Sequence, residues 1–323
     1  MKKNSKRSPD LGDDCEINFD KVLNKTALSM MALDQYANTT LAQKRFIDAI
    51  HTESMPLDRA ASEPGRMKHI FDEELNLDKY DYFLEVQEDV SEEFYSELVA
   101  GIGTEQACLF IETIAKYWFD SGKHQSAKVV GLKRAIHDYM VSVSSQQPFV
   151  SKPEATSFSK PSTFNKNEIE FILALNDQFM YQHIHCWLES HENGLQMGLA
   201  DVFLRRGINL SKLFEDGHIF NEWDYINSYS LATTLTEQFT YLGKGKHKVM
   251  LSSDFSLFNG RILFFAPFIN GMNTNQLEVG IIPSTTPLVL IYQGCHNKID
   301  EYRIVDKAKE DFVRKSYQFT QGW

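Results

Sequence analysis

Short runs of β-branched and aromatic residues, bounded by Gly, Pro or Asn, gather in the last quarter of this chain. The strands expected there are 249–252, 261–265, 277–282 and 288–292. Runs of this kind are typical of an antiparallel sheet. The preceding part of the chain instead repeats its apolar residues at helical spacing. The sequence therefore predicts an α+β protein with a mainly helical N-terminal half and C-terminal helices packed on a small antiparallel sheet.

Helical spacing of apolar residues recurs from residue 18 to residue 143. Its clearest segment runs from Thr104 to Phe119, where Thr104 is placed to cap a helix and Gly122 to end it. Residues 1–17 are polar and charged and contain few β-branched or aromatic side chains. A segment of that composition cannot bury enough apolar surface to fold. We therefore predict a disordered tail at 1–17 and a helical region at 18–143.

Pro148, Pro153 and Pro161 interrupt the helical pattern among Ser, Thr, Gln and Lys residues. Such a composition marks a linker or a long surface loop. We predict this linker at 144–165 and an α+β region at 166–323. The helices expected within the α+β region are 165–192, 195–206, 224–241 and 305–317.

The negative charge of the chain is concentrated in residues 71–100. This segment contains eleven Asp or Glu residues against Lys79 alone, so it contributes −10 to a net charge of −11. A block of this kind can attract a basic protein partner, and its simpler interpretation is a solvated helix face. The candidate binding residues of the segment are Glu88, Asp89, Glu92 and Glu93.

A basic stretch follows at 123–137, with no Asp or Glu within it. Its candidate binding residues are Lys133 and Arg134, which on a helix could contact phosphate or RNA. Aromatic residues that would stack on bases are not interleaved there. Pairing of this helix with the acidic segment is the simpler explanation, so nucleic-acid binding stays open.

Two polar residues, Asn176 and His183, fall within the apolar stripe of the predicted helix 165–192. A buried polar group without a partner costs about 1–3 kcal/mol, so both residues need partners in the fold. They would line a polar network or a pocket, or His183 would bond a backbone carbonyl. His185 and Glu189 share a face, but two ligands without a third predict no metal site.

The strand predicted at 249–252 leads directly into Ser253 and Asp254. Carboxylates at strand ends beside clefts are common catalytic positions, because the sheet fixes them while the loop stays open to substrate. Alternatively, Asp254 bonds its own backbone to start a turn. A cleft shared by Asp254, Ser253 and His183 would make the chain a hydrolytic enzyme, with nucleic acid as one substrate class.

The end of the chain shows a helix, a strand ending in Ser253 and Asp254, an apolar strand, a proline-rich entry from Ile282 to Leu290, and a closing helix. This order resembles a widespread bacterial family of uncharacterised proteins, over about the last 95 residues. Members of that family have a Ser-Asp-Asn-Pro turn, whereas this chain has Phe255 and Ser256 after the aspartate. It also lacks the family's N-terminal His-rich, Val-Pro-containing signature. The resemblance carries over only the serine and the aspartate and implies no activity.

The longest apolar runs fall far short of the roughly 20 residues of a membrane helix. The charged N-terminus is not followed by the apolar stretch of a secretory signal. We therefore expect no membrane association and a cytoplasmic location, and no motif indicates a cofactor. Two functions stay open: an interaction or regulatory protein that uses the acidic helical surface, which we favour, and a hydrolytic enzyme.

Overall fold

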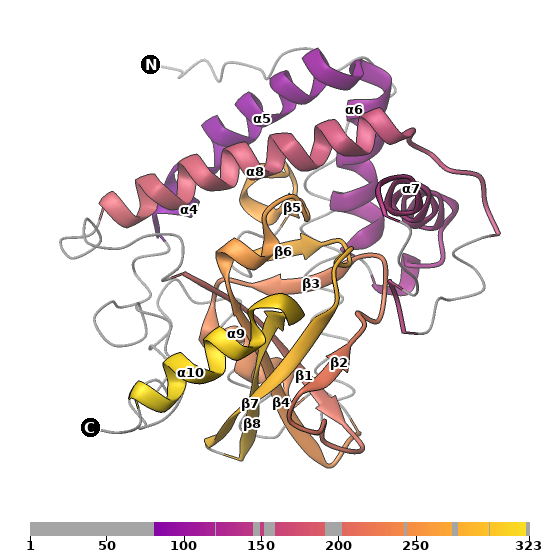
Figure 1. The fold of residues 1–323 in the computed structure, drawn as a ribbon. Helices are drawn as coiled ribbons and strands as arrows, with labels where there is room; N and C mark the ends of the chain where they lie inside the picture. Colours follow the sequence, from indigo (N-terminus) through magenta and orange to yellow (C-terminus); the bar gives the residue numbers. More distant parts are fainter. Residues whose placement is uncertain are drawn as a thin grey trace.

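The computed structural model describes residues 81–119, 121–144, 149–151, 159–190, 202–241, 244–272, 277–296 and 298–320. A layer of helices covers one end of a twisted sheet (Figure 1). The predicted tail at 1–17 and the expected helices at 18–80 lie outside the described residues. The described part of the predicted helical region, 81–143, contains helices and turns and no strand, and the α+β class is confirmed.

Helices of the N-terminal layer follow the predicted segments closely. They are α4 (Asp81–Glu85), α5 (Gln87–Ile102), α6 (Thr104–Glu112), the π-helix η4 (Thr113–Trp118), η5 (Ser121–Lys123), α7 (Ala127–Val143) and α8 (Lys166–Glu189). The cap expected from Thr104 is absent, because α6 begins at that residue and Gly103 occupies the capping position. Ser126 caps α7 by accepting a hydrogen bond from the Val129 N–H.

Helix α8 packs against two other helices of the layer and against the sheet. Asn165 and Glu168 form a capping box, in which each side chain accepts a hydrogen bond from the other residue's main-chain N–H. The buried face of α8 contacts α5, α7 and strand β5. Asn176, on that face, donates to the carbonyls of Ile172 at 2.9 Å and Leu263 at 2.8 Å. The amide nitrogen of Asn176 therefore has the predicted partners and joins α8 to the sheet, whereas its buried oxygen has no partner among the described residues.

The sheet contains eight described strands in the order β2-β7-β8-β4-β1-β3-β6-β5. They are β1 (Phe203–Leu210), β2 (His218–Phe220), β3 (Asn227–Ser230), β4 (His247–Asp254), β5 (Ile262–Phe265), β6 (Glu278–Ile281), β7 (Leu288–His296) and β8 (Ile299–Asp306). Neighbouring strands are antiparallel except β4 and β8, which run parallel. The small antiparallel sheet of the sequence analysis is thus corrected to a larger, mixed one.

Three predicted helices are wrong where they overlap strands. Strand β1 replaces the end of the expected helix 195–206, β3 the start of 224–241 and β8 the start of 305–317. The remaining helical parts are α9 (Thr233–Phe239) and α10 (Glu310–Thr320). Strand pairing overrides the helical preference of the local sequence at β1 and β3, because β1 pairs with β4 and β3, and β3 also pairs with β6.

One apolar core joins the helical layer to the sheet. Phe265 on β5 packs edge-on against Phe83 on α4 at 5.2 Å and against Phe268 at 5.1 Å between ring centroids. Residues on both sides of the predicted linker 144–165 belong to this core, and no helix or strand is described within the linker. A second small cluster of Val289, Ile291, Val305 and Val313 seats α10 on the sheet. None of the described helices has the length and apolar character needed to cross a bilayer.

Candidate functional site

His183 lies inside the aromatic part of the core. Its ring has 6% exposure and contacts Phe179 and Phe268, and Nδ1 lies 2.9 Å from the Tyr82 hydroxyl. Burial lowers the pKa of His183 against the opposing effect of Glu93, so the ring is neutral at pH 7. The expected polar partner exists, and it is a phenol hydroxyl rather than a backbone carbonyl.

Ser253 and Asp254 end strand β4 with their polar atoms already bonded. The Ser253 hydroxyl is buried and donates to the Ile304 carbonyl at 2.8 Å. Asp254 accepts a hydrogen bond from Arg303 at 3.1 Å and another from the Ser256 hydroxyl. These contacts have no residue in common with those of His183. No described contact therefore joins His183 to Ser253 or Asp254.

The two candidate basic residues of α7 both have acidic partners. Lys133 is 2% exposed, its Nζ lies 2.6 Å from an Asp224 oxygen, and it also sits 5.7 Å from the centre of the Trp118 ring. Arg134 pairs with Asp138 one turn later at 3.0 Å. Lys133 thus fixes α7 to the segment before β3 and does not present its charge to solvent. Neither of these two partners, Asp224 and Asp138, belongs to residues 71–100.

The four candidate acidic residues share the outer face of α5. Glu88, Asp89, Glu92 and Glu93 are exposed, and none forms an ion pair with a described residue. The opposite face of α5 buries Val90, Phe94 and Leu98. In Figure 1, α5 lies beside α8 at the top of the molecule. Among the described residues, this surface is accordingly the one sequence-predicted set whose side chains are all exposed and carry no ion pair.

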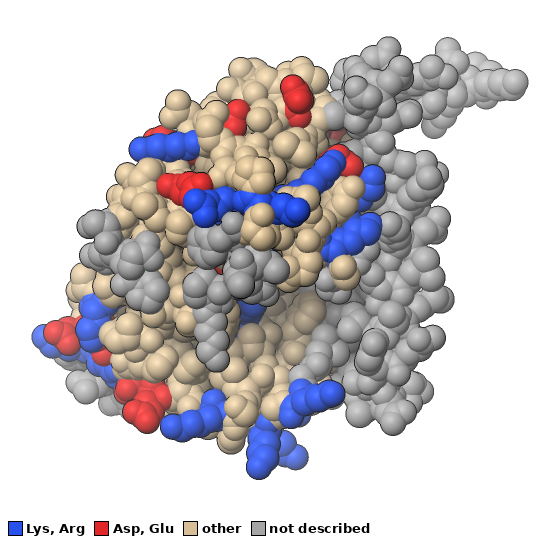
Figure 2. Space-filling model, turned by 90° about the vertical axis from the view of Figure 1, so that its right-hand side faces the viewer, with Lys and Arg blue, Asp and Glu red and all other residues tan. Residues whose placement is uncertain are grey.

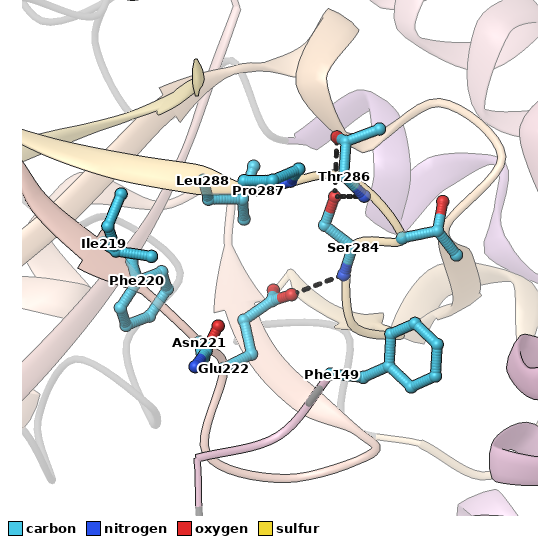
Figure 3. A pocket seen from close by; sticks show the side chains of 10 residues that line it. Phe149, Ile219, Phe220, Asn221, Glu222, Ser284, Thr286, Pro287 and Leu288 are labelled. Atoms are coloured by element: carbon cyan, nitrogen blue, oxygen red, sulfur yellow. Dashed lines mark hydrogen bonds between the residues drawn. The ribbon is translucent and has the colours of Figure 1, made fainter. Parts of the chain in front are cut away.

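A cavity of about 230 Å³ opens between strand β2 and the loop that joins β6 to β7 (Figure 3). Its lining residues are Phe149, Ile219, Phe220, Asn221, Glu222, Ser284, Thr285, Thr286, Pro287 and Leu288. Figure 3 shows the Glu222 carboxylate pointing across the cavity toward the loop. Part of this loop belongs to the proline-rich entry noted in the sequence, whereas the glutamate was not predicted.

Glu222 is the buried charge of this cavity, with 2% exposure. One of its oxygens lies 2.5 Å from Arg261 Nη2, and the other accepts the Ser284 main-chain N–H at 2.7 Å. Burial raises the pKa of Glu222, and Arg261 opposes that rise. Arg261 also donates from Nε to the Ile282 carbonyl at 3.0 Å. The pair is therefore a neutral unit that connects the cavity wall to the end of β6.

The loop side of the cavity presents hydroxyl groups. Thr286 donates from its hydroxyl to Asp306 at 2.8 Å, and its N–H donates to the Ser284 hydroxyl at 3.1 Å. No histidine, lysine or cysteine is among the lining residues, and both oxygens of Glu222 are already bonded. The one charged group among the lining residues is thus a carboxylate whose two oxygens already have partners. It suits a small neutral molecule or side chain with one hydrogen-bonding end.

A second polar cluster lies at the end of the π-helix η4. Glu278 accepts hydrogen bonds from the Trp118 indole at 3.2 Å and the Ser228 hydroxyl at 2.5 Å. His124 stacks on Trp118 with ring centroids 4.5 Å apart and donates from Nε2 to the Trp118 carbonyl at 2.6 Å. Burial raises the pKa of Glu278. π-helical turns are frequent at functional sites, yet no cavity is described beside this one.

Comparison with protein-family models, with curated proteins and with solved structures finds no match for this chain. The resemblance of the C-terminal part to a bacterial family therefore stays a prediction. Among the described residues, no group of three His, Cys, Asp or Glu side chains is arranged to hold a metal ion.

Proposed function

We propose that this chain is an interaction protein that binds a basic segment of another protein through the outer face of α5. Glu88, Asp89, Glu92 and Glu93 form this acidic face. The observation that carries the proposal is that all four side chains are exposed and have no ion-pair partner among the described residues. Exposed charge of one sign attracts a partner of the opposite sign and speeds its association.

The acidic face also works against the stability of its own helix. Glu88 and Glu92, Asp89 and Glu93, and Glu93 and Glu97 are like-charged pairs four residues apart, which together cost about 1 kcal/mol. Glu88 and Asp89 regain part of this through their place in the positive first turn of α5. Basic residues at some of these positions would remove the repulsion. A binding role explains why this face is acidic in spite of the repulsion between its carboxylates.

Charge reversal at the acidic face tests the proposal. The test variant carries Glu88→Lys, Asp89→Lys, Glu92→Lys and Glu93→Lys, and the probe is a fluorescently labelled oligolysine peptide followed by anisotropy. We expect wild-type protein to bind the peptide in low salt and to release it as salt rises, because exposed charges are screened. We expect the reversed variant to lose at least tenfold in affinity.

A control variant separates this face from total charge. It reverses four exposed acids on other elements, namely Glu170, Glu189, Glu215 and Asp311. Both variants change the net charge by the same amount, so equal losses of affinity would mean that only overall charge matters. That result, or no binding by the wild type in low salt, would refute the proposal. Circular dichroism spectra check that both variants fold.

The hydrolytic alternative receives no support from the described geometry. Asp254 and Ser253 are bonded to Arg303, Ser256 and Ile304, and His183 is enclosed by aromatic rings. None of the three candidate catalytic residues lines the described cavity. We therefore do not extend the hydrolase hypothesis beyond the sequence prediction.

A further inference from the structure

Three neighbouring strands begin or end together at the end of the sheet that lies away from the N-terminal helical layer. The register pairs Leu210 at the end of β1 with His247 at the start of β4, and Lys248 with Ile299 at the start of β8. Lysines stand at or just before the two strand starts. We call Lys244, Lys246, Lys248 and Lys298 the basic tip.

The charges of the basic tip are not neutralised by the described part of the protein. None of its four lysines forms an ion pair with a described acid, and Lys244, Lys246 and Lys298 are exposed. Desolvation and then repulsion from Lys298 lower the pKa of Lys248, whose Nζ lies 3.4 Å from the centre of the Tyr241 ring. Figure 2 shows Lys and Arg side chains spaced along the lower edge of the molecule.

Backbone geometry holds two parts of the basic tip in unusual positions. Lys298 has φ 64°, a left-handed conformation that costs a residue with a side chain about 1 kcal/mol or more. Gly245, between two of the lysines, lies so close to the Leu210 main chain that no Cβ would fit. The Lys244–Lys246 turn is thereby pressed against the end of β1. Strained backbone positions of this kind cluster at functional sites, so a lysine at a position that favours glycine points to a binding role for its charge.

The basic tip is wide enough to contact several phosphates at once. Neighbouring strands lie about 4.8 Å apart, so the three strand ends span about 10 Å. A duplex of that length carries about six phosphates. Lysine is a flexible point charge, which suits phosphate oxygens and does not read base edges. We propose that the basic tip binds the phosphate backbone of a nucleic acid without sequence preference.

An anionic membrane is the main competing ligand for such a surface. Peripheral membrane binding combines basic residues with exposed apolar side chains that insert between lipids. Among the described residues, the large exposed apolar side chains all lie outside the basic tip. The nucleic-acid backbone, which needs charge alone, is therefore the better fit.

The acidic face and the basic tip lie at opposite ends of the molecule. In Figure 1, α5 is at the top and the β7–β8 hairpin at the bottom. A protein with net charge −11 can approach a polyanion when its positive charge is separated from its negative charge in this way. The inference does not rest on the function proposed for α5, because the two surfaces share no residue.

Binding to a labelled 20-base-pair DNA duplex of random sequence, measured by anisotropy, tests the inference. We expect binding at 50 mM salt and a slope of log affinity against log salt of about −3 to −4, because each neutralised phosphate contributes about −0.9. The variant with Lys244→Gln, Lys246→Gln and Lys298→Gln should bind at least tenfold more weakly. The slope of log affinity against log salt for this variant should be shallower by about 2 to 3, because three phosphate contacts are lost.

A matched control removes the same charge elsewhere through Lys160→Gln, Lys166→Gln and Lys309→Gln, all at exposed positions. This control should bind the duplex within about twofold of wild type. Equal weakening in both variants, or no binding by wild type at 50 mM salt, would overturn the inference. So would sedimentation with phosphatidylserine vesicles without duplex binding. Self-association that rises with protein concentration and requires the tip, without duplex binding, would also overturn the inference. The ligand of the basic tip would then be the acidic face of a second copy of this chain.

Discussion

Asp177 on α8 has a largely buried carboxyl group with one hydrogen bond, from the Gly260 main-chain N–H, and its other oxygen has no partner among the described residues. Burial raises the pKa of Asp177 to about 6 from 3.8, and the Gly260 hydrogen bond opposes part of that rise. The folded state thus holds the proton more tightly than the unfolded state. The resulting stabilisation is fully present below pH 3.8 and is lost as the pH rises through 6.

Replacing Asp177 by asparagine should therefore stabilise the protein only where the carboxyl would be ionised. The Asp177→Asn side chain keeps an oxygen that can accept from Gly260 and cannot lose a proton. We expect the free energy of unfolding to rise by about 1–3 kcal/mol at pH 8, because one pKa unit is worth about 1.4 kcal/mol. Urea unfolding at pH 8 and at pH 4 checks this. A gain of the same size at both pH values would contradict it.

The Glu222 and Arg261 pair gives a prediction for buried charge. Arg261→Met removes the guanidinium and leaves the glutamate with only the Ser284 N–H as partner. We expect a loss of about 3–5 kcal/mol in the free energy of unfolding at pH 8, as for other broken buried pairs. The double variant Glu222→Met and Arg261→Met should lose less, because no unpaired charge remains. A larger loss in the double variant would show that the pair is not the cause.

Lys298 should show a conflict between stability and binding. Lys298→Gly relieves the left-handed strain at φ 64°, so we expect the free energy of unfolding to rise by up to about 1 kcal/mol. The same change removes one charge of the basic tip and should weaken duplex binding. Lys298→Ala is the control, since it loses the charge and keeps the strain. Thermal unfolding and anisotropy of both variants should give equal binding losses and different stabilities.

At the scale of the element, α5 combines a buried apolar stripe with a uniformly acidic outer face. Glu92→Lys would turn the repulsion with Glu88 into an attraction of the favourable orientation, with the acid four residues before the base. We expect a gain of about 0.5–1 kcal/mol in the free energy of unfolding, together with weaker oligolysine binding. Glu170→Lys on α8 serves as a comparison for a single charge reversal. Destabilisation by Glu92→Lys would mean that this carboxylate has a structural role.

Elements whose stability is local could be predicted from the sequence. The capping box of Asn165 and Glu168, together with the helical spacing of buried residues, places α8 almost at its observed ends. Strands β1 and β3 could not be placed from the sequence, because they contain Arg, Gly, Asn and Ser, which do not favour strands. Their conformation is determined by pairing with strands distant in the sequence. The acidic segment that contains this face could be found by counting charges along the chain, because eleven of its residues are Asp or Glu. Glu222 could not be found this way, since Arg261 and Ser284 lie 39 and 62 residues along the chain.

At the scale of the whole molecule, the helical layer and the sheet share one core. Phe83, Phe94 and Trp187 from the helices belong to the same cluster as Phe264 and Leu251 from the sheet. The predicted linker at 144–165 therefore joins two regions of sequence that bury their apolar surface against each other. When two layers share a core in this way, unfolding of either layer exposes the apolar surface of the other, so we expect both layers to unfold together.

Phe265 is the residue through which this coupling can be tested. Its ring is fully buried on β5 and touches Phe83 of the helical layer as well as Phe268. Phe265→Ala should lower the free energy of unfolding by about 3–5 kcal/mol. Native-state hydrogen exchange should show the slowest amides of α8 and of β4 falling by that same amount. Val313→Ala, in the small cluster under α10, is the control and should leave the slowest α8 amides within about 1 kcal/mol of wild type, because that cluster is separate. A loss confined to the β4 amides would mean that the layers unfold independently.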